Sequence, residues 1–135
     1  RYTNDEIDID IVVLFKNLAL LIEVKDSQVA KHFFINENQQ ELYYRKKGKA
    51  QSAMGKPVRS LKKAVDYVSN NEDWGTLYPI IVINNPVPLK KWEHLLVELG
   101  EQKYMQYQGI FIVEKQEIIP LIRAILDLNE MGESA

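Results

Sequence analysis

At 135 residues, 46% of them hydrophobic, the chain is long enough for one domain with a buried core. It has no cysteine, which excludes disulfides, zinc–thiolate sites and cysteine nucleophiles and favours a cytoplasmic protein. The net charge of -2 argues against a generally basic nucleic-acid-binding surface, although the local distribution of charge matters more than the sum. No apolar run is long enough for a bilayer span and no signal peptide is visible, so we expect no membrane partner.

The first predicted element is a hairpin over Glu6–Lys25, in which two apolar segments flank a tight turn at Lys16 and Asn17. If the turn has two residues, Phe15 lies opposite Leu18, and the register of both strands follows by counting back from this pair. Directly opposed residues project to the same side of a sheet. The sequence therefore predicts which hairpin side chains share a face.

Charged side chains gather at the open end of this hairpin. The predicted register places Asp10 opposite Glu23 and Asp8 opposite Lys25, and all four project to one face because side chains alternate along a strand. Two carboxylates about 5 Å apart repel by roughly 3 kcal/mol at an effective dielectric of about 20. Lys25 relieves part of this repulsion, and Mg²⁺, which favours carboxylate oxygens, waters and phosphates, would relieve more. The alternative interpretation is a solvated salt-bridge cluster at a strand end.

The rest of the chain alternates between helical and strand patterns, which predicts an α/β sandwich. Apolar residues at helical spacing in 57–70 form a stripe, whereas the continuous apolar run at 78–83 is typical of a strand buried on both faces. In chain order we predict a short strand or helix over 29–35, a polar loop over 36–41, a mixed stretch with helical propensity over 42–54, a helix over 57–70, a strand over 78–83, an amphipathic helix over 89–99, a strand over 109–114, and a helix over 116–128 with Pro120 in its first turn.

Basic residues are concentrated after the hairpin. Between Leu42 and Val65 there is no acidic residue, and a basic, glycine-containing stretch of this kind can neutralise phosphates. The usual alternative is a solvated helix face next to a basic loop. The candidate nucleic-acid contacts in and around this stretch are Arg45, Lys46, Lys47, Lys49, Gln51, Lys56, Arg59, Lys62 and Lys63.

The spacing D-x(12)-E-x-K, formed by Asp10, Glu23 and Lys25, resembles the core motif of the PD-(D/E)xK nuclease superfamily. The surrounding segments E-I-D-I-D-I-V-V-L and L-L-I-E-V-K are similar to its restriction-endonuclease-like and nuclease-related (NERD-like) branches. The resemblance implies a restriction-endonuclease-like sandwich, with a central mixed sheet flanked by helices. It also implies that residues 1–135 form a single nuclease-like domain, a fragment without the helix and strand that usually precede the acidic strand.

The function that the resemblance implies is metal-dependent hydrolysis of phosphodiester bonds, most often in DNA. Asp10, Glu23 and the Val24 carbonyl would bind Mg²⁺ or Mn²⁺, which polarises a phosphoryl oxygen and lowers the pKa of a bound water. Lys25 would orient this water or stabilise charge on the phosphate. Asp8 and Glu6 are alternative acidic ligands that would replace the group normally supplied by the upstream segment.

Other assignments stay open at this point. In many superfamily members a glutamine or basic residue faces the metal from the helix after the E-x-K strand, and Gln51, Lys56 and Arg59 are candidates for that position. The main alternative function is a catalytically inactive nuclease-like domain that binds nucleic acid or a protein partner. Cutting both strands of a duplex calls for two active sites, so a homodimer is a further expectation.

Overall fold

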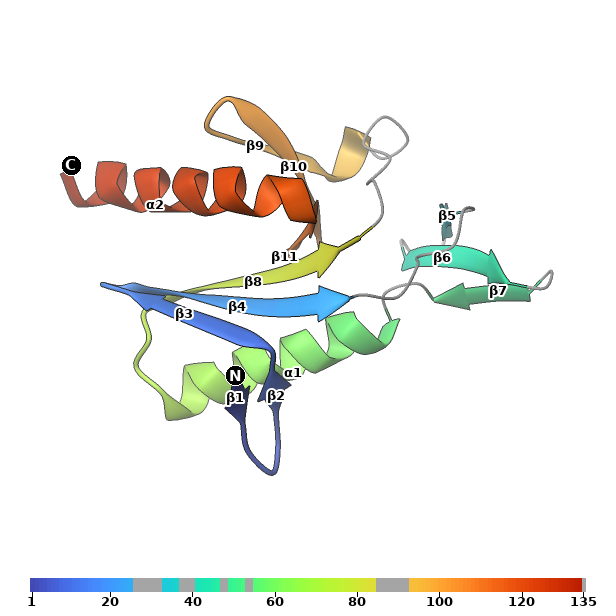
Figure 1. Cartoon of the computed structure of the whole chain (residues 1–135), viewed down its shortest axis with the longest axis horizontal. Helices are drawn as coiled ribbons and strands as arrows, with labels where there is room; N and C mark the ends of the chain where they lie inside the picture. The colour runs from blue at the N-terminus through green and yellow to red at the C-terminus, as the bar shows by residue number, and fades with distance from the viewer. Residues whose placement is uncertain (26–32, 37–40, 47–48, 53–54, 85–92, 135) are drawn as a thin grey trace.

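The computed structural model describes residues 1–25, 33–36, 41–46, 49–52, 55–84 and 93–134. Its centre is a six-stranded mixed sheet with the strand order β3-β4-β8-β11-β10-β9 (Figure 1). Strands β4, β8 and β11 are parallel, and the outer pairs β3–β4, β11–β10 and β10–β9 are antiparallel. The strand bounds are Ile11–Phe15 for β3, Leu18–Lys25 for β4, Thr76–Ile83 for β8, Leu96–Leu99 for β9, Gln102–Tyr107 for β10 and Ile110–Glu114 for β11.

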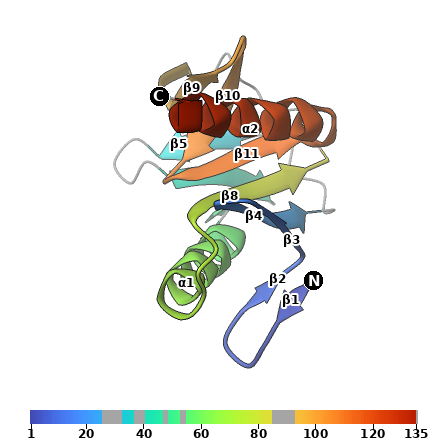
Figure 2. The same ribbon diagram turned by 90° about the vertical axis from the view of Figure 1, so that its left-hand side faces the viewer.

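Two helices cover opposite faces of this sheet, α1 (Gly55–Asn71) on one side and α2 (Ile118–Ser134) on the other (Figure 2). Alternate residues of β4 and β8 therefore belong to different hydrophobic cores. Leu21 and Ile81 pack on the α1 side, whereas Leu20 and Ile80 pack on the α2 side. This explains the continuous apolar runs, because a strand covered on both faces has no solvated side. The predicted α/β architecture with a mixed sheet flanked by helices is confirmed.

Smaller sheets are attached at the N-terminus and after β4. Strands β1 (Tyr2–Thr3) and β2 (Asp8–Ile9) form an antiparallel pair. Strands β5 (Phe33–Asn36), β6 (Glu41–Lys46) and β7 (Lys49–Ser52) form a three-stranded sheet, drawn to the right of the central sheet in Figure 1.

Two predicted helical stretches were wrong. The described residues of the stretch over 42–54 form β6 and β7, because each of these strands pairs with a neighbour that local propensity does not reveal. Residues 96–99 of the predicted helix over 89–99 form β9, which pairs along its whole length with β10, a strand that was not predicted. Residues 89–92 of that helix, and most of the elements predicted over 29–41, lie outside the described residues.

The other predicted elements are confirmed with shifted ends. Helix α1 begins at Gly55, before Pro57, and β8 begins at Thr76. A short 3₁₀ helix, Lys115–Glu117, precedes α2, whose first turn contains Pro120. No helix in the described part of the chain is long and apolar enough to cross a membrane.

Candidate active site

The predicted hairpin register is confirmed. Strand β3 pairs with β4 so that Phe15 lies opposite Leu18 and Ile11 lies opposite Ile22. The two-residue turn between them includes Lys16 in a left-handed conformation, with φ of 49°.

The predicted partner of Asp8, in contrast, is wrong. The β3–β4 ladder ends at Ile11, and Asp8 pairs in β2 with Thr3 instead of opposing Lys25. The cause is a bend at Asp10, beyond which the chain leaves β4, joins β1, and packs Ile9 against the core on the α1 side.

In β2, Asp8 accepts hydrogen bonds from Arg1 at the N-terminus and from Thr3 of β1. Arg1 donates Nη2 to Asp8 Oδ2 at 2.7 Å and Nε to Oδ1 at 3.0 Å, and Thr3 Oγ1 donates to Oδ1 at 2.7 Å. These donors stabilise the charged form and lower the pKa of Asp8 to about 2. Glu6 lies in the exposed turn between β1 and β2. Neither carboxylate therefore completes a cluster with Asp10 in this arrangement.

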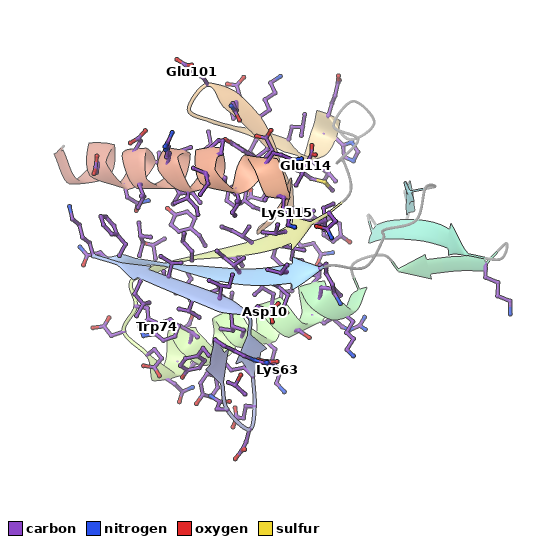
Figure 3. The ribbon with its side chains drawn as sticks, viewed as in Figure 1. Asp10, Lys63, Trp74, Glu101, Glu114 and Lys115 are labelled. Atoms are coloured by element: carbon purple, nitrogen blue, oxygen red, sulfur yellow. The ribbon has the colours of Figure 1, made fainter. Side chains whose placement is uncertain are left out.

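Asp10 connects the bend to the end of β4. Its Oδ2 accepts a hydrogen bond from the Val24 backbone N–H at 2.9 Å, where a backbone carbonyl would have continued the ladder. Figure 3 labels Asp10 at the start of β3, on the side of the sheet that α1 covers. The side chain thereby closes the hairpin end and brings its carboxyl group next to β4.

The Glu23 carboxyl group lies within hydrogen-bonding reach of Asp10. Its pKa is raised from 4.5 to about 7, first by burial, then by the hydrogen bond to Asp10 and by the charges of Asp10 and Asp8, while Lys25 acts in the opposite direction. Two acidic groups this close do not both ionise easily. Near neutral pH the pair is therefore stabilised by a shared proton or by a cation in its place.

Lys25 and the Val24 backbone complete the end of β4. Glu23 and Lys25 belong to the α1 side of the sheet because they continue the alternation of Ala19 and Leu21, which lie in that core. The N–H and C=O of a strand residue point to the same side, so the Val24 carbonyl faces toward Asp10 as its N–H does. The predicted trio and the Val24 carbonyl are thus brought to one end of the hairpin.

The donor set fits a hard divalent cation only in part. Two carboxyl groups and a carbonyl oxygen are ligands that Mg²⁺ accepts, with waters and a substrate phosphate in the remaining positions. Within the described ranges, however, no group of three or more histidine, aspartate or glutamate side chains is placed to hold a metal ion.

The basic stretch divides between two parts of the fold. Helix α1 exposes Lys56, Arg59, Lys62 and Lys63, and Lys62 Nζ also donates to Gln108 Oε1. Figure 3 labels Lys63 on α1, the helix that covers the same face of the sheet as Asp10. The remaining candidates lie before α1: Arg45 and Lys46 in β6, Lys49 and Gln51 in β7, with Lys47 outside the described residues.

The expectation that Gln51 lies on the helix after β4 is wrong. It lies in β7, because β6 pairs with β7 over this part of the chain. Lys56 and Arg59 are therefore the candidates that do lie on α1.

Sequence reasoning missed Arg1 and the bend at Asp10, and it missed a cavity between β10 and β11. The cavity has a volume of about 280 Å³ and lies where the two strands diverge beyond the Met105–Ile112 pair. None of the predicted site residues lines it. Its lining residues are Gln102, Lys103, Tyr104, Met105, Ile112, Val113, Glu114 and Glu117.

No protein-family model, curated protein or solved structure matches this chain. The functional interpretation therefore depends on the chain's own residues and their geometry.

Proposed function

We propose that this chain is a metal-dependent nuclease domain of the restriction-endonuclease-like type, which hydrolyses phosphodiester bonds in DNA. The observation that carries the proposal is the pair Asp10–Glu23, whose carboxyl groups meet with Lys25 on the same face of β4. Burial and the neighbouring Asp10 carboxyl group raise the pKa of Glu23 to about 7, so the pair is destabilised as a dianion, and a divalent cation is the partner that would best relieve it.

Asp10, Glu23 and the Val24 carbonyl would hold Mg²⁺ or Mn²⁺. When bound, the ion supplies Lewis acidity toward a phosphoryl oxygen and lowers the pKa of a coordinated water. The Val24 N–H keeps Asp10 Oδ2 oriented, so the carboxyl group that meets Glu23 has a fixed position. The half-buried setting of Glu23 limits competition from bulk water.

Lys25 would act on the substrate. Its ammonium group lies one alternation beyond Glu23 on the same face, where it can stabilise charge on a phosphate or orient the attacking water. The exposed basic residues of α1, such as Lys56 and Arg59, would contact the DNA backbone, because this helix lies on the same side of the sheet as Glu23 and Lys25 (Figure 2).

The test is digestion of supercoiled plasmid and of short linear duplexes with Mg²⁺ or Mn²⁺, with EDTA as the negative control. Asp10→Asn keeps an oxygen for the Val24 N–H but removes the charge, and we expect cleavage to fall by at least about 100-fold. Lys25→Ala should have a similar effect. Glu98→Gln, an exposed substitution in β9, is the matched control and should cleave like the wild type. Cleavage that persists in both Asp10→Asn and Lys25→Ala would exclude the mechanism.

A second candidate function is a nuclease-like domain that only binds nucleic acid or a protein partner. The specific observation in its favour is that Asp8 is engaged by Arg1, so the described site offers two carboxylates and no third. Thermal melting distinguishes the candidates, because a ligand that binds only the folded state raises the melting temperature. The nuclease should be stabilised by Mn²⁺ in an Asp10-dependent way, whereas the binding domain should be indifferent to the metal.

A further inference from the structure

Strand β3 is the edge strand of the central sheet, and most of its side chains are exposed although they are apolar. Ile11 is 44% exposed, Val13 39%, Leu14 57% and Phe15 41%. Their direct partners on β4 are buried: Leu20, opposite Val13, is 1% exposed. The α2 layer thus covers β4 but leaves Ile11, Val13 and Phe15 of β3 exposed, and Leu14 is exposed on the α1 side.

The outer edge of β3 also offers unpaired backbone groups in the described structure. Phe15 and Leu18 flank a two-residue turn and therefore exchange hydrogen bonds with each other, and such pairs alternate along an antiparallel ladder. Val13 and Ile11 consequently point their N–H and C=O groups toward β4. Val12 and Leu14 point theirs away from the sheet, where β3 has no neighbouring strand among the described residues.

None of the usual devices that protect an edge occurs within β3. Natural edge strands are shielded by lysine, proline, bulges or inward-pointing charges. The sequence of β3, Ile-Val-Val-Leu-Phe, contains none of these residues, and the nearest charges flank it at Asp10 and Lys16.

We propose that a second copy of this chain pairs with β3 through the same strand, in an antiparallel register centred on Val13. The register places Val13 opposite its own symmetry mate, Ile11 opposite Phe15, and Val12 opposite Leu14. It joins the outward backbone groups of Val12 and Leu14, and it matches apolar side chains with apolar side chains on both faces.

The residue pattern of β3 favours a second copy over an unrelated strand. All five residues of β3 are apolar, so two-fold pairing about Val13 opposes apolar side chains at every position, and the symmetry repeats each contact. Registers shifted by two residues keep the backbone bonding but bring an apolar residue of β3 opposite Lys16 or the bend at Asp10. The proposed dimer joins two six-stranded sheets into one continuous sheet and does not depend on the nuclease assignment.

Disulfide trapping tests the register. The chain has no cysteine, so Val13→Cys can only cross-link between copies. Opposed residues of a non-hydrogen-bonded pair have Cα atoms about 4.5 Å apart, at the short end of the range of about 4.4–6.8 Å that a disulfide spans. We expect this variant to cross-link at least about tenfold faster than Leu14→Cys, whose mate is displaced along the strand, or Ile119→Cys, which is 54% exposed on α2. Equal rates for the three variants would overturn the proposed register.

Sedimentation equilibrium on the uncross-linked protein, without metal or DNA, tests the dimer itself. The wild type should dimerise with a micromolar dissociation constant, because one strand pair buries less area than a standard interface. Val13→Lys, which opposes two like charges, and Leu14→Pro, which removes an outward N–H, should each raise that constant at least about tenfold. Ile119→Lys should leave it unchanged, and circular dichroism melts confirm that each variant is folded. A wild type that stays monomeric up to about 200 µM refutes the proposal.

Discussion

Replacing Glu23 by glutamine separates the electrostatic state of the site from its shape. The amide has the size of the carboxyl group and can donate to Asp10, but it carries no charge at any pH. In the wild type, the pKa of Glu23 rises from 4.5 in the unfolded chain to about 7 in the folded protein, because of burial and the neighbouring Asp10 carboxylate. The folded state therefore holds a proton that the unfolded state has already released.

The sign of the effect follows from this proton. Between pH about 4.5 and about 7 the folded wild type binds more protons than the unfolded chain, so its free energy of unfolding falls as the pH rises and stays lower above that range. At about 1.4 kcal/mol for each pH unit, the full difference would be about 3 kcal/mol. Glu23 is only partly buried, and water screens its interactions, so we expect about 1–2 kcal/mol.

The assay is urea unfolding of the wild type and Glu23→Gln in EDTA, at several pH values from about 4.5 to about 8.5. The variant should gain stability relative to the wild type as the pH rises, reaching a plateau of about 1–2 kcal/mol above pH about 7. Glu98→Gln, in the exposed part of β9, should track the wild type at every pH. A difference between Glu23→Gln and the wild type that does not change with pH would refute the proposed Asp10–Glu23 coupling. Adding Mn²⁺ should then stabilise the wild type at high pH more than the variant.

Two further predictions concern Gly75, which packs against Asn17 of the β3–β4 turn, and the proposed DNA-binding surface of α1. Gly75→Ala should destabilise the fold by more than about 2 kcal/mol, because Gly75 has φ of 77° and an added Cβ would lie 2.0 Å from the Asn17 carbonyl oxygen. Gly109→Ala, where φ is 82° and nothing lies within 4 Å of the added Cβ, should cost only about 1 kcal/mol, and equal melting temperatures for the two variants would contradict this reasoning. Arg59→Ala, on the exposed side of α1, should weaken binding to short duplex DNA in EDTA and reduce the slope of log K against log salt by about 1, as expected for one lost phosphate contact. Lys103→Ala in β10 serves as the control, and an unchanged slope in Arg59→Ala would exclude α1 from the DNA surface.

The register of the central hairpin could be predicted because local features determine it. A two-residue turn sets which residues oppose each other, and the alternation of side chains then assigns Glu23 and Lys25 to one face. Helix α1 was predictable for a similar reason, since its buried face follows the helical spacing of Val58, Leu61 and Val68.

The partner of Asp8, in contrast, depended on a bend in the chain and on a contact with Arg1, neither of which the alternation of side chains along the hairpin predicts. The predicted hairpin register was extended past Ile11 on the assumption of a straight strand. The chain instead bends at Asp10, and Asp8 forms an ion pair with Arg1. Residues 96–99 have a helical pattern and form a strand, because pairing with β10 satisfies their backbone groups. Local periodicity therefore determined the hairpin, the shared face of Glu23 and Lys25, and helix α1 from the sequence alone. Only the tertiary structure decided which carboxylates meet, because that choice depends on how separate strands bend and pair and on how deeply the packed sheet buries Glu23.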